Sequence, residues 1–294
     1  MQIIEINDKN INAAGVKCVV AGLEVKTTKT GKQYLSGTVM DPTGTMGFKI
    51  WDNVNPMMNL MASGNAVELK SAVSDDFGGT VSLKISSVSL LTPEEAAGLI
   101  QMAPVPKEKL EEKLNGYLQE YKLEAGIEKL KAAGIWDRFL YVPAAMSHHH
   151  AYRHGLLQHS IEVCEMALKM ADAQKEYHGL ELNRTVLAVS GLFHDIGKVY
   201  EYEINPLGLF TGFSEDGILI GHHFLSTNLV NKVFAKCVDA DTLKQIDHCI
   251  LSHHGRPEWG AAVPPKTPEA YLIHLSDMAS SQPVSVKDEP KPLY

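Results

Sequence analysis

The feature that most constrains this chain is an adjacent His194 and Asp195 at the end of the apolar run Leu187–Phe193. A helix that buries this run carries an imidazole and a carboxylate into the interior side by side. Burying a carboxylate is costly unless a positive partner meets it, and a divalent metal ion is such a partner. Lys198 lies four residues after His194 and three after Asp195, so it shares their side of the helix. The stretch therefore predicts a buried polar site.

The histidines are confined to the second half of the chain. All thirteen fall at or after position 148, and several are adjacent, as in His148–His150, His222–His223 and His253–His254. Even usage along the chain would rarely give this distribution. We therefore expect a polyhistidine site in the second half and a different task for the first half.

Composition and charge place the chain among ordinary globular proteins. It has 294 residues, 45% of them hydrophobic, which is enough for two domains with separate cores. No apolar run approaches the eighteen or so residues of a membrane helix, the beginning of the sequence does not resemble a signal peptide, and the four cysteines are scattered. We expect a cytoplasmic protein with reduced thiols and no membrane partner. The net charge of −8 belongs to the second half, so nucleic acid would be held by local features rather than by a broad basic face.

Residues 1–91 read as a small barrel of strands. Strands are predicted at 16–25, 33–41, 45–51, 66–74 and 80–89, with a helix at 53–62 between the third and the fourth. Three strands, a short helix and two strands match the five-stranded oligonucleotide- and oligosaccharide-binding barrel, the OB-fold.

Such barrels often hold single strands by stacking bases on exposed rings and following the backbone with cations. The candidate contacts of this kind are Tyr34, Phe48, Lys32 and Lys49. The alternative is that the rings fill the barrel and the lysines are solvated, and Trp51 in particular is expected to be buried.

The rest of the chain is predicted to be helical. Residues 92–106 read as a linker with a short capped helix, broken by prolines at its end. Residues 107–282 alternate amphipathic helices with short loops and show no convincing strands, which predicts an all-α domain. Residues 283–294, rich in Pro, Lys and Asp, are predicted to form a loose tail.

Candidate metal ligands come from several of these predicted helices. Each lies on or beside an apolar face, which favours a buried cluster over a solvated surface. In chain order they are His159, His194, Asp195, His222, His253, His254 and Asp277. Singly, each histidine is more often structural than a ligand, but as a set they indicate a metal site.

At these residues the chain resembles a known family. His159, His194-Asp195 and Asp277, in that order on separate helices, resemble the HD-domain metal-dependent phosphohydrolases, and His222 and His253-His254 resemble the subset that holds two metals. Longer strings, among them Phe193-His-Asp-Ile-Gly-Lys198 and Leu251-Ser-His-His-Gly-Arg-Pro-Glu-Trp-Gly260, are similar to YhaM-type 3′-5′ exoribonucleases. Those proteins also carry an OB-fold ahead of the HD domain, and the resemblance runs from about residue 10 to residue 281.

The resemblance implies roles for the ligands. One metal would be held by His159, His194, Asp195 and Asp277, and a second by Asp195, His222, His253 and His254, with the Asp195 carboxylate bridging. Two such ions can activate a hydroxide and clamp the attacking and leaving oxygens of an in-line displacement. Mixed imidazole and carboxylate ligation suits Mn²⁺, which is the family's habit, or Fe²⁺, and Co²⁺ or Zn²⁺ could enter too.

Other residues near these motifs have open roles. Lys198 would offset charge on the scissile phosphate, or else form a salt bridge to a nearby acid. His149, His150 and Arg153 could contact phosphates or protonate the leaving oxygen, or His148–His150 could be a surface run without a catalytic role. Trp259 would line the substrate path or pack in the core.

The sequence departs from the family at two places. His154-Gly155 stands where the family has paired glycines, and Ser276-Asp277-Met278-Ala279 stands where it has Asp-Asn before a further Asp-Ala. The essential aspartate is kept, but its neighbours are not.

The leading interpretation is a metal-dependent phosphodiesterase that trims single-stranded RNA, or DNA, from the 3′ end and releases nucleoside 5′-monophosphates. A second keeps the HD site but acts on nucleotides, cyclic dinucleotides or short oligonucleotides. A third is a non-catalytic protein that binds single strands. Assembly into a homo-oligomer, a tendency of the family, would give multivalent grip on a strand.

Overall fold

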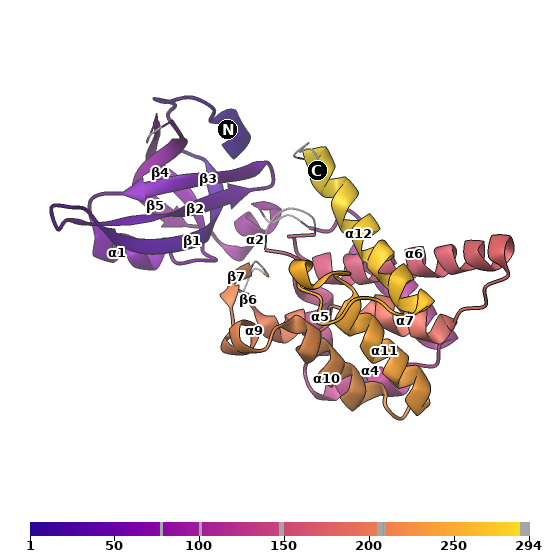
Figure 1. Cartoon of the computed structure of the whole chain (residues 1–294). Coiled ribbons are helices and arrows are strands. Elements are labelled where there is room, and N and C mark those ends of the chain that lie inside the picture. The colour runs from indigo at the N-terminus through magenta and orange to yellow at the C-terminus, as the bar shows by residue number, and fades with distance from the viewer. Residues whose placement is uncertain (77–78, 100–101, 147–149, 205–207, 209, 289–294) are drawn as a thin grey trace. The chain divides into compact units, whose positions relative to one another are not determined.

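The computed structural model describes residues 1–76, 79–99, 102–146, 150–204, 208 and 210–288. The chain divides into two compact units, one built on strands and the other on helices (Figure 1). The first comprises residues 1–101 together with 204–211, and the second comprises residues 102–203 together with 212–294. Among the described helices, none is both long enough and apolar enough to cross a membrane.

The first unit is a closed five-stranded barrel with the strand order β1-β2-β3-β5-β4. Its strands are β1 (Lys17–Thr27), β2 (Gln33–Asp41), β3 (Gly44–Ile50), β4 (Ala66–Asp76) and β5 (Val81–Leu90), preceded by the 3₁₀ turn η1 (Ile3–Glu5). Helix α1 (Val54–Leu60) connects β3 to β4, β1 pairs with β4 to close the barrel, and β3 runs parallel to β5. This closed order, with the helix between the third and fourth strands, is that of the OB-fold and confirms the predicted fold.

The barrel core is apolar and includes Phe48, which was predicted from the sequence to contact nucleic acid. Phe48 on β3 is 1% exposed and packs with the side chains that alternate inward along the strands. A side chain on Gly37 of β2 would overlap this ring and the carbonyl oxygen of Gly22, so the glycine makes room for it. The prediction that Phe48 stacks on a base is therefore wrong, because its position on β3 points the ring into the barrel.

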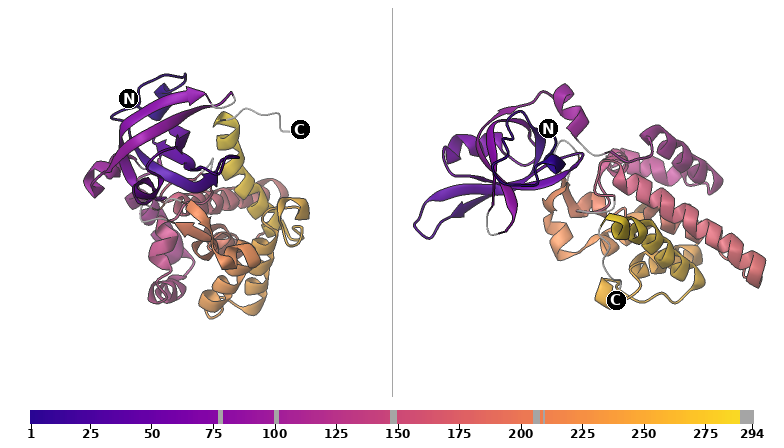
Figure 2. Two further views of the ribbon diagram at one scale, coloured as in Figure 1. Left: turned by 90° about the vertical axis from the view of Figure 1, so that its left-hand side faces the viewer. Right: turned by 90° about the horizontal axis from the view of Figure 1, so that it is seen from above.

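Two short elements lie in the predicted linker, α2 (Pro93–Ala96) and η2 (Ala97–Leu99). The second unit then contains the helices α3 (Lys107–Glu120), α4 (Glu124–Ala132), α5 (Trp136–Tyr141), α6 (Gly155–His178), α7 (Arg184–Phe193), α8 (Lys198–Glu201), α9 (Glu215–Leu219), α10 (His222–Phe234), α11 (Ala240–Ser252) and α12 (Pro268–Asp288), with the 3₁₀ turn η3 (Pro257–Trp259). Helix α6 packs against α7 and α12, and α11 packs against α7, α10 and α12. Figure 2 shows the same elements from two further sides.

The part of the chain predicted to be helical and the tail after it each differ from the prediction in one place. A two-stranded sheet, β6 (Tyr202–Ile204) with β7 (Phe210–Phe213), interrupts a segment in which no strand was expected. In addition, α12 continues through Pro283 to Asp288, where the sequence predicts that a loose tail has begun. Both segments are short, and neither has enough residues to show a hydrophobic period in the sequence.

The departure at His154 has a structural explanation. His154 immediately precedes α6 and has the left-handed backbone angle φ 67° that glycine adopts most easily. Its buried ring Nδ1 lies 2.6 Å from the carbonyl oxygen of Leu140, so a ring N–H can donate to it. The side chain thus ties the start of α6 to the end of α5, which offsets part of the backbone strain.

Candidate metal centre

The apolar run before the His-Asp pair forms α7, as predicted. The side chain of Asn183 caps its first turn by accepting the N–H of Val186, and every residue from Val186 to Phe193 is buried. His194 ends the helix and Asp195 begins the following turn, with 0% and 2% of their surfaces exposed. The pair is therefore fully inside the helical unit.

Two glycines let neighbouring helices approach this turn. A side chain on Gly191 would overlap the backbone of Cys164 in α6, and one on Gly197 would overlap the carbonyl oxygen of His222 and the backbone of Ser226 in α10. The N–H of Gly197 also donates to the Ser226 hydroxyl at 2.8 Å. These contacts bring His159 of α6 and His222 of α10 to the His-Asp pair.

Three ligand-type side chains meet on one side of Asp195, and we call them the inner cluster: His159, His194 and Asp277. The Nε2 atom of His159 lies 3.2 Å from Asp277 Oδ1 and 3.2 Å from His194 Nε2. Burial alone would raise the pKa of Asp277, but the adjacent ring of His159 and the neighbouring rings of His253 and His194 hold it well below its usual range. The carboxylate is therefore ionised, as a metal ligand must be.

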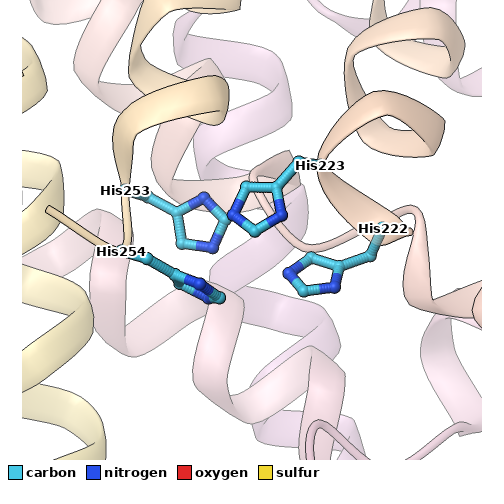
Figure 3. A group of neighbouring side chains, drawn as sticks. All are labelled: His222, His223, His253 and His254. Carbon is cyan, nitrogen blue, oxygen red and sulfur yellow. The ribbon is translucent and has the colours of Figure 1, made fainter. Parts of the chain in front are cut away.

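Four imidazoles meet on the other side, and we call them the four-histidine cluster: His222, His223, His253 and His254. The first two begin α10 and the last two follow α11, so two chain segments supply one pair each (Figure 3). One ring nitrogen from each lies within 4.8 Å of the others. Burial lowers the pKa values of His253 and His254 and lowers that of His223 to about 3. These three rings are consequently neutral near pH 7.

Asp195 divides its carboxylate between the two groups. Its Oδ2 lies 2.6 Å from Lys198 Nζ and 3.6 Å from Nε2 of both His159 and His194. Its Oδ1 lies 3.5 Å from His222 Nε2 and 3.6 Å from His253 Nε2. Burial raises the pKa of Asp195, but Lys198 and the surrounding imidazoles outweigh burial and hold that pKa well below its usual range. One ionised carboxylate thus faces both groups.

The outer ring nitrogens are tied to acceptors, which fixes the tautomers. The Nδ1 atoms of His194 and His253 face the carbonyl oxygens of Gly191 and Ile250 at 3.1 and 2.7 Å, so each carries the ring proton. His222 Nδ1 lies 3.0 Å from the Glu201 carboxylate. In all three rings the Nε2 lone pair is therefore directed toward Asp195 and the neighbouring histidines.

His159 is oriented by a longer chain of hydrogen bonds. The Ser280 hydroxyl donates to Glu162 Oε2 at 2.6 Å, so it accepts from Nδ1 of His159 at 3.0 Å. His150 and Gln158 also donate to the Glu162 carboxylate. Burial opposes these bonds, but they hold the pKa of Glu162 at about 2. The Nε2 atoms of His159 and His194 then face each other at 3.2 Å as two acceptors.

The arrangement leaves several buried acceptors unsatisfied. Asp195 Oδ1, His222 Nε2, His223 Nε2, His253 Nε2 and His254 Nδ1 are buried without a hydrogen-bond partner among the described residues. An unpaired buried polar atom costs about 1–3 kcal/mol, and here the unpaired atoms converge. Neutral imidazoles and ionised carboxylates around a common space fit divalent cations.

Lys198 contacts Asp195 and also lines an adjacent cavity. Its ammonium group donates to Asp195 Oδ2 and, at 2.7 Å, to the carbonyl oxygen of Ala144. Burial alone would lower the pKa of this amine, but Asp195 raises it above its ordinary value, so the side chain is cationic. The salt bridge that the sequence left as an alternative is thus present.

The cavity has a volume of about 600 Å³. Five of its lining residues belong to the two clusters or contact them, namely His159, Asp195, Lys198, His254 and Asp277. The rest of the lining includes Trp259, His274, Met278, Ser281 and Gln282. Trp259 is 53% exposed, with the Arg256 guanidinium 5.0 Å from its ring centroid. Trp259 therefore presents an aromatic surface beside the cluster instead of packing in the core.

The remaining predicted contacts lie elsewhere. Tyr34 is half-buried on the barrel and stacks on Trp51, with ring centroids 4.4 Å apart. Lys32 pairs with Asp52 at 3.0 Å, and Lys49 is on β3. In the helical unit, Arg153 lies over the Tyr141 ring at 4.3 Å.

Two adjacent histidines, His149 and His150, were predicted to act in catalysis. His149 falls outside the described residues. His150 is 3% exposed and bonded to Glu162. Its position favours holding Glu162 over protonating a leaving group.

Sequence reasoning missed four residues of the site. His223 was passed over because its neighbour His222 already matched the family's motif, although the double histidine was a visible signal. Glu162, Glu201 and Ser280 act behind the ligands, and no motif in the sequence marks them. Helical spacing offers one clue, since Glu162 lies three residues after His159 on α6.

Comparison with known proteins agrees with this geometry. The HD domain family matches residues 156–280, the segment that holds both clusters. Proteins named 3′-5′ exoribonuclease YhaM from Listeria monocytogenes, Listeria innocua and Listeria welshimeri are 29% identical over 259 residues, covering 86% of this chain and 80% of each relative.

Two solved OB domains are similar to part of the chain. The OB domain of MM0293 from Methanosarcina mazei is 24% identical with a TM-score of 0.28, covering 35% of this chain and 93% of that domain. The OB domain of Ta0387 from Thermoplasma acidophilum is 15% identical with a TM-score of 0.25, covering 36% of this chain and 92% of that domain. Residues 156–280 thus match the HD domain family, and over most of its length the chain is similar to the YhaM exoribonucleases.

Proposed function

We propose that this chain is a metal-dependent phosphodiesterase that removes nucleotides from the 3′ end of single-stranded RNA. The observation that carries the proposal is the set of buried, unpaired acceptors around Asp195, which divides its two carboxylate oxygens between two groups of ligands. The similarity to exoribonucleases adds the polymer and the direction of cleavage.

The ligand sets follow from the two sides of Asp195. The inner cluster with Asp195 would hold one cation, and Asp195 with His222, His253 and His254 would hold a second. Two divalent cations at these positions would polarise the phosphodiester and lower the pKa of the attacking water. Mixed carboxylate and imidazole donors at the first position suit Mn²⁺.

The protein's own groups position the substrate and its charge. Lys198, cationic and at the wall of the cavity, would pair with the scissile phosphate and offset charge that develops on it. Glu162 and Glu201 hold His159, through Ser280, and His222, so that their lone pairs stay directed inward. The rings are thereby oriented before the substrate arrives.

The cavity would receive the terminal nucleotide. Its volume of about 600 Å³ is of the size of small-molecule sites. The half-exposed ring of Trp259 offers a base a stacking surface, which accepts any base because each has a π-face. A monophosphate product would leave from the same cavity.

The barrel would grip the strand farther from its 3′ end. Tyr34, supported by Trp51, supplies a ring, and the cations are Lys32, directly before β2, and Lys49 on β3. Assembly into a homo-oligomer would let several barrels bind one strand. Light scattering measures the mass of the particle, and the mass of a single chain would exclude this part of the proposal.

The central test is a time course on 3′- and 5′-labelled single-stranded RNA and DNA, with Mn²⁺ and with a chelator. We expect a ladder that shortens from the 3′ end, needs the metal, and yields nucleoside 5′-monophosphates. Asp195→Asn should lower the rate by more than about 100-fold, the upper end of what an outer hydrogen-bond partner costs.

The matched control is Asp241→Asn, an exposed carboxylate in the first turn of α11, which should retain the wild-type rate. Metal-loaded protein that cleaves neither polymer would overturn the proposal. Its HD site would then be tested on nucleotides and cyclic dinucleotides.

A further inference from the structure

His223 belongs to the four-histidine cluster but to neither of the two ligand sets proposed above. It is the second residue of α10, and its ring stacks on His222 and His253 with centroids 4.3 and 4.7 Å away. The ring of His254 meets it edge-on at 4.5 Å. Figure 3 shows His223 among the other three rings, in the space between the two chain segments.

One ring nitrogen of His223 has no partner in the described structure. His223 Nε2 is buried and unpaired, and so are His222 Nε2, His253 Nε2 and His254 Nδ1. Ring stacking alone does not account for the residue, because phenylalanine would stack equally well and leave no buried nitrogen to satisfy. A position that keeps the nitrogen buried beside three others indicates a shared ligand.

We propose that His223 is a fourth imidazole ligand of the second cation position, and that this position selects ions that favour nitrogen donors, Co²⁺, Ni²⁺ or Zn²⁺, over Mn²⁺. The inference rests on the proposed metal centre but not on its substrate. The position gathers four ring nitrogens, and Asp195 Oδ1 lies 3.5 Å from Nε2 of His222 and 3.6 Å from Nε2 of His253.

The inner position differs in chemistry. It combines His159 and His194 with two carboxylates, Asp195 and Asp277. Imidazole suits zinc, copper, iron and nickel, whereas carboxylate oxygen suits manganese and magnesium. The two positions therefore select different ions, and the centre is heterometallic when both kinds of ion are present.

The test measures metal content and not turnover. Full-length protein is stripped with a chelator and dialysed against Mn²⁺, Co²⁺ or an equal mixture, and bound metal is counted by mass spectrometry. We expect two ions per chain, with one of each kind from the mixture. His223→Phe keeps the stacked ring but removes its nitrogens, and it should weaken the second Co²⁺ site by at least about tenfold, the lower bound for an outer hydrogen-bond partner.

Controls separate a ligand from a packing residue. His178→Phe, an exposed histidine at the end of α6, should bind both ions as the wild type does. The visible absorption of bound Co²⁺ should change in His223→Phe and stay unchanged in His178→Phe. Equal Co²⁺ affinity and an unchanged spectrum in His223→Phe would overturn the inference.

A measurement on the wild type covers the case in which His223→Phe does not fold. X-ray absorption of protein loaded with Mn²⁺ and Zn²⁺ together should show a zinc shell dominated by imidazole, and an oxygen-dominated zinc shell would refute the selectivity. RNA cleavage is scored separately. Binding that depends on His223 without cleavage would refute only the proposed function, and cleavage with Co²⁺ binding that ignores His223 would refute only this inference.

Discussion

The barrel and the helical unit both bury polar side chains, but they satisfy them differently. In the barrel, Asp41 accepts the backbone N–H groups of Ile3 and Thr43, and Ser74 is bonded to the backbone of Asp8 and Ile11. Among the described residues, each buried side-chain nitrogen or oxygen that lacks a partner belongs to the helical unit.

The difference separates a complete core from an incomplete one. The barrel closes its backbone ladder and fills its interior with apolar side chains, so its stability needs no added ligand. The helical unit gathers acceptors around Asp195, whose lysine partner is Lys198. We therefore expect its folded state to be linked to divalent cations, and that of the barrel not to be.

The largest expected effect breaks the barrel alone. Phe48→Ala removes a fully buried ring and should lower the free energy of unfolding of the barrel by about 3–5 kcal/mol. The barrel's unfolding transition in calorimetry should shift to lower temperature, while bound Mn²⁺ per chain stays at the wild-type value. Loss of metal together with the barrel would show that the units fold as one.

Chelation should act on the other unit. A ligand present at 100 times its dissociation constant stabilises the folded state by about 2.7 kcal/mol, so removing one cation should lower the free energy of unfolding of the helical unit by about that amount. Calorimetry with and without chelator should show one transition that moves and one that does not. Equal shifts of both transitions would contradict the comparison.

The barrel and the ligand-bearing helices could be predicted from sequence because each depends on local pattern. Alternation places the strands within two or three residues of β1–β5, and the apolar run before His194 places α7. Two outcomes depended on the direction in which a side chain points, which the hydrophobic pattern does not give. Phe48 points into the barrel because of its register on β3, and His223 faces inward because α10 begins at His222, one residue before it.

Outer contacts could not be predicted for a related reason. Glu201 reaches His222 across 21 positions, and Ser280 reaches His159 across 121. Such pairs arise from tertiary packing and leave no spacing in the sequence. The β6–β7 sheet escaped because strands of three and four residues carry too few alternations to detect.

A third prediction concerns the aromatic wall of the cavity. Base stacking on an aromatic side chain contributes about 1–3 kcal/mol, so Trp259→Ala should raise KM by about tenfold or more on strands of any length and leave metal content unchanged. Trp259→Phe retains a ring and should lose less. A fall in kcat with unchanged KM would instead assign the ring a role in the chemical step.

The smallest effect should distinguish the barrel's grip from the cavity's. Tyr34 is half-covered by its stack on Trp51, so its contribution belongs at the lower end of the stacking range, about 1 kcal/mol or roughly fivefold in KM. Because the barrel is proposed to hold the strand away from its 3′ end, Tyr34→Ala should raise KM on a long RNA and leave a trinucleotide unaffected. Trp259→Ala, by contrast, should affect both substrates.

The pair of substrates makes the comparison between the units quantitative. The ratio of KM values for long and short RNA measures the barrel's contribution, and KM for the trinucleotide measures the cavity's. If Tyr34→Ala changed both by the same factor, the barrel would act on the helical unit instead of on the strand. In the described part of the barrel, no buried side-chain nitrogen or oxygen lacks a partner through which such an influence could act, so we expect the ratio alone to rise.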